Sequence, residues 1–190
     1  MNGPQIETDR CWLRPFSEEY LSARYVGWLN DPDVVRHSEQ RHRRHTPDSC
    51  RAYLRSFDGT PHFFMAIVAK DAALGHVGNI NAYIDVPNRV ADVGILVGER
   101  AVWGKGYGSE AWIAFTQFLL HKQALRKVTA GTLASNHGML GIMRRGGWRS
   151  RRPANARPSS KGRRSSWSTR PCSQVRLSSC LLYTSPSPRD

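Results

Sequence analysis

The sequence predicts an α+β fold, in which a mixed, mostly antiparallel, twisted sheet is flanked by helices as in an α/β sandwich. Three strand-like segments, 62–69, 73–86 and 90–98, follow one another with very short connections, which favours an antiparallel meander. The third leads through a glycine-rich turn into an amphipathic helix, 109–122, and then into a strand, 126–133. A strand, helix, strand unit closes as a right-handed crossover and places its two strands side by side and parallel.

The residues before the meander predict a first strand and two helices. The strand covers residues 7–16. Ser17 suits the N-cap of the first helix, because two acids follow it, and Asn-Asp-Pro at 30–32 ends that helix. Thr46 and Pro47 suit the N-cap and first turn of the second helix, which we expect to reach about residue 57.

The glycine-rich turn predicts an anion site. Gly104, Gly106 and Gly108 allow the backbone to approach a ligand without Cβ clashes, and the free amides at a helix start favour an anion such as a phosphate. The turn lacks the Gly-Lys-Ser/Thr of a nucleoside-triphosphate loop. Its Gly-x-Gly-x-Gly spacing, with no acid at 126–130, also excludes the dinucleotide fingerprint. A glycine-rich turn without a ligand is the remaining alternative on the glycines alone.

Charge and composition restrict the class of protein. The formal charge is +13, but 149–190 contributes ten Lys/Arg and one acid, so 1–148 carries only +4. Whole-chain basicity therefore does not indicate nucleic-acid binding. The four cysteines form no metal-type spacing, the first ten residues lack an apolar signal core, and no apolar run spans a membrane. We expect a reduced, soluble, cytoplasmic protein without a bound metal.

A nine-residue run carries the most specific motif of the chain: Trp103-Gly104-Lys105-Gly106-Tyr107-Gly108-Ser109-Glu110-Ala111. It resembles the coenzyme A pyrophosphate loop of the GCN5-related N-acetyltransferase (GNAT) superfamily. The resemblance is to the RimJ/RimL-like branch, in which Trp often holds the Gln/Arg position as Trp103 does here. It extends over about residues 7–148. It implies a GNAT fold, acetyl-CoA as cosubstrate and transfer of the acetyl group to an amine.

The same resemblance implies which residues bind the coenzyme. Trp103 through Ser109 would hold the pyrophosphate by backbone amides. Leu96, Val97 and Gly98 would pair with the pantetheine arm like another strand, and the Val97 N–H would polarise the thioester carbonyl. Asn136, which precedes a last predicted helix ending at Gly146-Gly147, would bond the coenzyme or the splayed strand.

Candidate catalytic residues follow less directly. Asp92 lies fourteen residues before Gly106, where the family commonly places a Glu general base. Asp92 is otherwise an ordinary acid on a strand surface, and an acceptor amine with a lowered pKa could react without a base. The family often protonates the thiolate with a Tyr, but Met143 stands near that position and cannot donate a proton. His137 or Tyr83 could substitute for it.

The segment 36–45 is unusually basic, with four Arg, three His and one Glu. It could be a basic loop on the acceptor side, a metal site formed by His42 and His45, or a polar loop that faces water.

From about Arg149 the apolar periodicity ends, and 149–190 contains eleven Ser, ten Lys/Arg and five Pro. We therefore expect a C-terminally incomplete GNAT domain at 1–148, followed by a tail that is disordered or out of frame. The family places two further strands in this region, which we expect to be missing or scrambled. Our hypothesis is a frameshift near 147–151, with translated adapter sequence at 183–190.

Three functions remain open from the sequence. The first is an N-acetyltransferase that acts by direct attack in a ternary complex on a protein N-terminus, an amino sugar or another small amine. The second is a catalytically degenerate acyl-CoA-binding or regulatory module. The third is a nucleic-acid or ribosome binder acting through 36–44 and the tail. We expect acetyl-CoA and an amine-bearing substrate as partners, without a membrane or a specific nucleic acid. A homodimer is compatible with the sequence.

Overall fold

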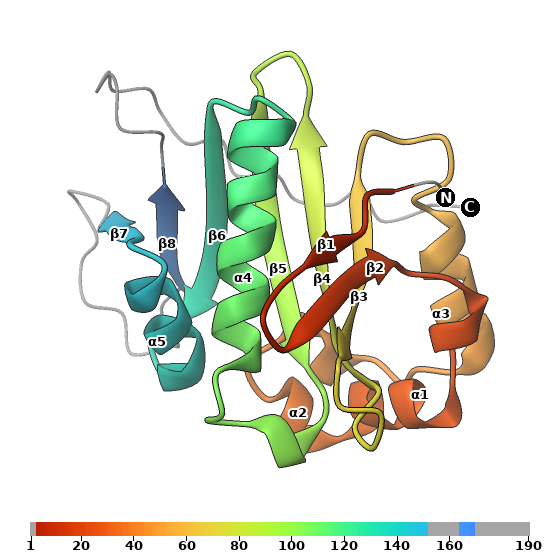
Figure 1. Ribbon diagram of the computed structural model, residues 1–190. Coiled ribbons are helices and arrows are strands. Elements are labelled where there is room, and N and C mark those ends of the chain that lie inside the picture. The colour runs from red at the N-terminus through yellow and green to blue at the C-terminus, as the bar shows by residue number, and fades with distance from the viewer. Residues whose placement is uncertain (1–2, 152–163, 170–190) are drawn as a thin grey trace.

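The computed structural model describes residues 3–151 and 164–169 and contains one sheet in the order β1-β2-β3-β4-β5-β6-β8-β7 (Figure 1). The strands are β1 (Ile6–Glu7), β2 (Cys11–Pro15), β3 (Phe63–Ala69), β4 (His76–Asp85), β5 (Val90–Val97), β6 (Lys127–Leu133), β7 (Arg149–Arg151) and β8 (Arg164–Thr169). All neighbouring strands are antiparallel except β5 and β6, which are parallel. The expected mixed sheet, the meander β3-β4-β5 and the parallel crossover are thus confirmed.

Helices cover both faces of this sheet. They are α1 (Ala23–Asn30), α2 (Pro32–Val35), α3 (Pro47–Arg55), α4 (Tyr107–Gln117) and α5 (His137–Arg145), with a π-helical turn η4 (Phe118–Lys122) and the 3₁₀ turns η1 (Glu18–Tyr20), η2 (Glu39–His42) and η3 (Arg100–Val102). Figure 1 shows α4 running alongside the strands β5 and β6 on one face of the sheet. Trp112 and Phe115 of α4 are fully buried against that face, whereas Trp28 of α1 and Leu54 of α3 belong to a second apolar cluster on the other.

The strand β3 is buried on both faces of the sheet, which explains why its sequence is apolar without alternation. Met65 and Ile67 pack in the cluster under α4, while Phe64 and Ala66 pack in the cluster under α1 and α3. A strand buried on both faces needs apolar side chains at every position. The aromatic content concentrates on the second face, where Phe64 stacks on Phe16 with ring centroids 4.2 Å apart.

The N-terminal elements differ from the sequence prediction in two places. The strand expected over 7–16 is a hairpin of β1 and β2, closed by the Thr8 N–H donating to the Cys11 carbonyl at 2.9 Å. Ser17 makes no side-chain cap, and only the 3₁₀ turn η1 follows it. The helix α1 begins six residues later, where the Ser22 hydroxyl accepts the Tyr25 N–H at 3.2 Å. The turn η1 brings Tyr20 against Phe16, and both side chains are buried.

The predicted start of the second helix is confirmed. Thr46 caps α3 in a reciprocal capping box with Ser49, and Pro47 is the first residue of that helix. The ladder between β3 and β4 shifts register after Ile67, where Gly78 is the partner residue, as glycine-containing bulges do. At both places the local sequence signal predicts the structure that is observed.

Residues beyond the predicted domain boundary take part in the sheet. The strand β8 pairs with β6 from Val128 to Leu133, and β7 pairs with β8. The sequence predicted that the strands after β6 are missing or scrambled, and the structure has two short strands there. The division of the chain at residue 148 stays a prediction, and the hypothesised adapter segment 183–190 lies outside the described residues.

Adding a methyl group to Gly78 should destabilise the sheet where β4 approaches the end of β5. A Cβ at Gly78 would lie 2.3 Å from the Leu96 carbonyl oxygen and 3.0 Å from the Val97 Cα. Because backbone cannot give way like a side chain, we expect Gly78→Ala to lower the free energy of unfolding by roughly 2 kcal/mol or more, measured by denaturant titration.

Gly131→Ala is the matched control, because Gly131 also lies in a strand and has no heavy atom within 4 Å of its built Cβ. We expect that variant to stay within about 0.5 kcal/mol of the parent protein. Equal losses in the two variants would contradict the steric explanation.

Candidate active site

The strands β5 and β6 pair over a short stretch and then diverge. Their register covers only three residue pairs, of which Asp92–Thr129 is the last, although β5 continues to Val97 and β6 to Leu133. The edge of β5 beyond Asp92 therefore has no partner strand among the described residues. Because backbone N–H and C=O groups need partners, such an edge can accept an extended ligand.

The register of β4 and β5 determines which amides face that edge. The Gly98 N–H donates to the Val77 carbonyl at 3.0 Å, so it is directed at β4. Amides alternate along a strand, which directs the Leu96 N–H at β4 as well and the Val97 N–H at the open edge. The Val97 carbonyl, on the same edge, accepts the Trp103 indole N–H at 2.8 Å. Of the three predicted pantetheine-binding residues, Val97 alone directs its N–H towards a ligand at this edge.

The glycine-rich turn leads directly into α4, which begins at Tyr107 and so two residues earlier than predicted. Gly106 is the N-cap residue, with φ at +93°, a left-handed conformation that suits glycine. No side chain caps this helix, and its first backbone bond is from the Glu110 N–H to the Gly106 carbonyl at 3.0 Å. The amides of Tyr107, Gly108 and Ser109 therefore form an uncapped helix start that attracts anions.

The start of α4 lies against the end of β5 and against α5. A Cβ built on Gly108 would lie 3.1 Å from side-chain carbons of both Val97 and Ile142, so a larger residue would displace them. Ser109 is buried, and its hydroxyl accepts the Arg145 Nε–H at 2.9 Å. These contacts hold the helix start next to the open edge of β5.

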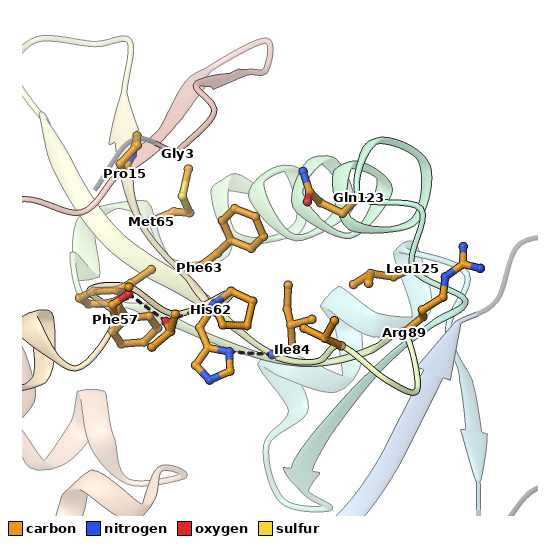
Figure 2. Close-up of a pocket in the computed structure, with 15 residues that line it drawn as sticks. Gly3, Pro15, Phe57, His62, Phe63, Met65, Ile84, Arg89, Gln123 and Leu125 are labelled. Atoms are coloured by element: carbon orange, nitrogen blue, oxygen red, sulfur yellow. Dashed lines mark hydrogen bonds between the residues drawn. The ribbon is translucent and has the colours of Figure 1, made fainter.

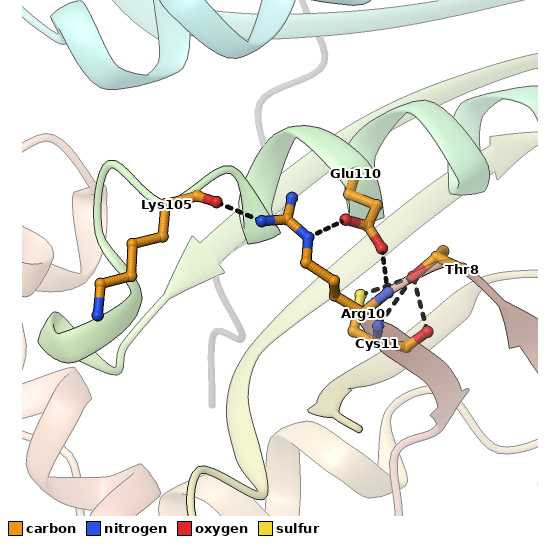
Figure 3. Close-up of polar contacts among 5 residues, drawn as sticks. All are labelled: Thr8, Arg10, Cys11, Lys105 and Glu110. Atoms are coloured by element: carbon orange, nitrogen blue, oxygen red, sulfur yellow. Dashed lines mark hydrogen bonds and ion pairs between the residues drawn. The ribbon is translucent and has the colours of Figure 1, made fainter. Parts of the chain in front are cut away.

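Arg10 binds the other side of the turn, as Figure 3 shows. Its Nη1 donates to the Lys105 carbonyl at 2.5 Å, while its backbone N–H and Nε each donate to Glu110 at 2.7 Å. Sequence reasoning did not find Arg10, because its partners lie about a hundred positions further along the chain.

The structure brings the two candidates Asp92 and Tyr83 together. They are opposite each other in the β4–β5 ladder, on the face of β5 that Leu96 shares and α4 does not cover. The exposed Asp92 carboxylate accepts the Thr129 hydroxyl at 3.0 Å. The Tyr83 and Tyr53 hydroxyls lie 2.8 Å apart, and burial raises the pKa of Tyr53 far above its ordinary value. The Asp92 carboxylate thus lies beside the point at which β5 and β6 part, whereas the Tyr83 hydroxyl is directed at Tyr53 of α3.

The candidates on α5 are placed differently. Asn136 is the N-cap residue, and its side-chain oxygen accepts the Met139 N–H at 3.0 Å, so that oxygen is engaged by the helix. His137 is exposed at the helix start. Burial lowers the pKa of His37, and the charges of Arg36 and His137 lower it further. His37 therefore lies near enough to His137, at the start of α5, for the two charges to interact.

The described residues support neither a proton donor at position 143 nor a metal site. Met143, at the position where the family often has a Tyr, is fully buried and has no proton to donate. Across residues 3–151 and 164–169, no group of three or more His, Cys, Asp or Glu side chains is arranged to hold a metal. In the same residues, no helix has the length and apolar character needed to cross a membrane.

A groove of ≈ 510 Å³ lies at the opposite end of the strands (Figure 2). Its walls are largely apolar, with Phe63 at the start of β3, Ile84 near the end of β4 and Leu125 before β6, and Arg89 stands at its rim. None of the predicted site residues lines it. We place the candidate site along the open edge of β5 instead, from Asp92, where β5 and β6 part, to the uncapped helix start beside Val97.

Together, a sheet whose central parallel strands diverge and an uncapped helix start beside them define a protein suited to an extended, anionic ligand. The acetyltransferase (GNAT) domain family model matches residues 10–149. The chain therefore belongs to this family of acetyltransferases, as the resemblance indicated.

Solved structures share the fold. An acetyltransferase of the GNAT family from Bacillus anthracis has a TM-score of 0.70 and 17% identity, and the match covers 87% of this chain and 96% of that chain. The ribosomal L7/L12 alpha-N-protein acetyltransferase RimL, in complex with coenzyme A, has a TM-score of 0.73 and 12% identity, over 88% and 98%. The microcin C7 self-immunity acetyltransferase MccE, in complex with acetyl-CoA and AMP, has a TM-score of 0.69 and 13% identity, over 85% and 93%. No curated protein matches the sequence.

The Arg10–Glu110 pair should make stability depend on pH in the acid range. Burial alone would raise the pKa of Glu110, but hydrogen bonds from Thr8 and Arg10 outweigh it and hold the pKa below 4.5. A lowered carboxyl pKa means that the pair stabilises the fold above pH 4.5 and that this contribution is lost as the pH falls through the folded-state pKa. We expect the difference in unfolding free energy between the parent and Glu110→Gln to shrink below that pH. A difference that stays constant would contradict the assignment.

Proposed function

We propose that this chain is an N-acetyltransferase that transfers the acetyl group of acetyl-CoA to a primary amine by direct attack in a ternary complex. One observation carries the proposal: the uncapped start of α4 lies beside the open edge of β5. The helix start supplies donors for a diphosphate, and the edge supplies backbone groups for the extended arm that follows it.

The residues present fit coenzyme A at its diphosphate end. Gly104 has no atom within 4 Å of its built Cβ, so the turn is open there, and no side chain caps the first amides of α4 after Gly106. The diphosphate would be held by the amides of Gly106, Tyr107 and Gly108. When bound, acetyl-CoA supplies a thioester whose carbonyl carbon an amine can attack. Trp103 would shield the edge rather than contribute a charge, since its indole is bonded to Val97.

The chain's own groups supply the remaining chemistry. The carbon–nitrogen bond forms as the carbon–sulfur bond breaks, so a proton leaves the amine and a proton returns to the sulfur. Asp92 would accept the amine proton, directly or through water, because it lies at the last shared register of β5 and β6. A backbone N–H on the open edge of β5 would donate to the carbonyl oxygen on which negative charge develops. The Tyr83–Tyr53 hydroxyl pair would return a proton to the sulfur, with His137 as the alternative donor.

The acceptor site would lie on the face of the sheet that α4 does not cover, where Asp92 and Tyr83 are directed. Protein N-termini, amino sugars and other small amines all carry the primary amine that this mechanism needs. The motif Trp103–Ala111 supports the RimJ/RimL-like branch, and RimL shares the fold. Dimerisation and a cytoplasmic location remain predictions.

A second candidate is an acyl-CoA-binding module without catalysis. The buried Met143, in place of a proton donor on α5, favours it. The two candidates differ in turnover, because both bind acetyl-CoA and only the enzyme releases free thiol in the presence of an amine. A thiol-release assay across a panel of amines separates them.

We expect acetyl-CoA to bind the full chain with a measurable heat in titration calorimetry, and Gly108→Val to weaken that binding. The valine side chain would displace Val97 and Ile142 at the helix start, where a Cβ already lies 3.1 Å from each. Gly141→Ala is the control, because the nearest atom to its built Cβ is 3.7 Å away. No heat with the parent chain at high micromolar acetyl-CoA would exclude the proposed function.

Removing the carboxylate of Asp92 should reduce the rate more than the affinity. We expect Asp92→Asn to lower kcat/KM for the amine by about 10²-fold or more, which is typical for loss of a general base, and to leave acetyl-CoA binding unchanged. Asp85→Asn is the matched control, since Asp85 is an exposed acid on the same face of the neighbouring strand β4. Equal rates for the two variants would show that Asp92 is an ordinary surface acid.

A further inference from the structure

We propose that Arg10 is a positioning residue for the diphosphate site, because it fixes the orientation of the Lys105–Gly106 peptide and neutralises Glu110 at the start of α4. This inference rests on the proposed function, since it concerns how the same chain prepares its site for acetyl-CoA. Arg10 lies on the turn between β1 and β2, remote from α4 in sequence but in contact with it in space (Figure 3).

The peptide between Lys105 and Gly106 is held in one orientation by Arg10. Arg10 Nη1 binds the Lys105 carbonyl at 2.5 Å. In a trans peptide the carbonyl and the following N–H point in opposite directions, so the Gly106 N–H is directed away from Arg10 and is available to an anion. Glycine adopts either sign of φ, so rotation of this peptide would be sterically cheap without Arg10. The rotated peptide would present a carbonyl oxygen to the diphosphate instead of a donor.

Arg10 also balances the negative charge at the start of α4. Glu110 is an acid in the first turn of α4, where it favours the helix but would repel an anionic ligand. Arg10 engages both of its carboxylate oxygens, through the backbone N–H and through Nε, each at 2.7 Å. The Glu110 side chain is only 16% exposed, so solvent alone screens it poorly. Pairing with Arg10 leaves the helix start with a net attraction for phosphate.

Further contacts keep the guanidinium in place. It lies over the Tyr107 ring, 5.0 Å from the centroid, and a Cβ built on Gly106 would meet its Nη2 at 2.8 Å. Arg10 is therefore packed against the N-cap residue and the first residue of α4 as well as bonded to the turn. A glycine at position 106 leaves room for this packing.

The test compares the parent with Arg10→Met and uses two donors that differ in the diphosphate, acetyl-CoA and S-acetylpantetheine. We expect Arg10→Met to raise the KM and the calorimetric Kd for acetyl-CoA roughly 10- to 100-fold, about the effect of one charge-assisted hydrogen bond. We expect kcat at saturating acetyl-CoA and kcat/KM for S-acetylpantetheine to stay within about twofold, because neither needs the diphosphate contact.

Two further variants separate the effect of Arg10 on the charge of Glu110 from its effect on the Lys105–Gly106 peptide. In Arg10→Met/Glu110→Gln the unpaired carboxylate is gone, so we expect part of the lost affinity to return, while the peptide remains unrestrained. Arg10→Lys keeps the charge but cannot bind Glu110 and the Lys105 carbonyl together, so we expect an intermediate Kd. That variant carries the comparison should Arg10→Met fail to fold.

Arg51→Met is the matched control, because Arg51 also bridges acidic side chains of two segments, Glu18 at 3.3 Å and Asp48 at 2.9 Å, away from the turn. It reports what losing such a bridge costs the fold, and we expect its acetyl-CoA affinity to be unchanged. Equal losses for acetyl-CoA and S-acetylpantetheine in Arg10→Met, or unchanged binding of acetyl-CoA, would overturn the role of Arg10. A parent chain that binds no acetyl-CoA would overturn the proposed function itself.

Discussion

The divergence of β5 from β6 after Asp92 is the constraint on which the site depends. Parallel strands that remained paired to their ends would satisfy the Val97 amide and leave nothing at that edge for a ligand. The structure shows what stands in place of the missing pairing: the Trp103 indole bonds the Val97 carbonyl. The side chains of Val97 and Ile142 both press against Gly108 at the start of α4. One local arrangement thus holds the strand end, the turn and two helices around the same point.

Much of the fold was predictable because local signals and burial agree. The apolar run of β3, the reciprocal cap at Thr46 and the short connections of the meander each admit one economical structure, and the structure adopts it. The start of α1 was predicted wrongly because Ser17 and Ser22 both suit an N-cap. Burial of Tyr20 in the aromatic cluster, rather than the cap itself, accompanies the later start. Local chemistry alone could not choose between two equally suitable residues.

The candidate site was predictable in its motif but not in its contacts. The glycine spacing marked the turn, and the alternation of β5 placed Asp92 on a defined face. The direction of each amide in β5 depends on the register with β4, which no local pattern fixes, so Leu96 and Gly98 could not be separated from Val97 in advance. Asn136 caps the start of α5, as an asparagine at that position commonly does. Arg10 carried no signal at all, because a lone arginine beside a short turn is ordinary in any sequence.

The start of α4 shows how one helix can satisfy two opposing electrostatic demands. A negative side chain in the first turn stabilises a helix, whereas a diphosphate ligand requires the same region to be positive. Glu110 meets the first demand, and its pairing with Arg10 removes the conflict with the second. The cation comes from the far N-terminal hairpin rather than from α4, so the helix start becomes suited to an anion only when β2 has joined the sheet beside β3. The ligand site is therefore a property of the assembled fold, although its recognisable motif is a single short run of residues.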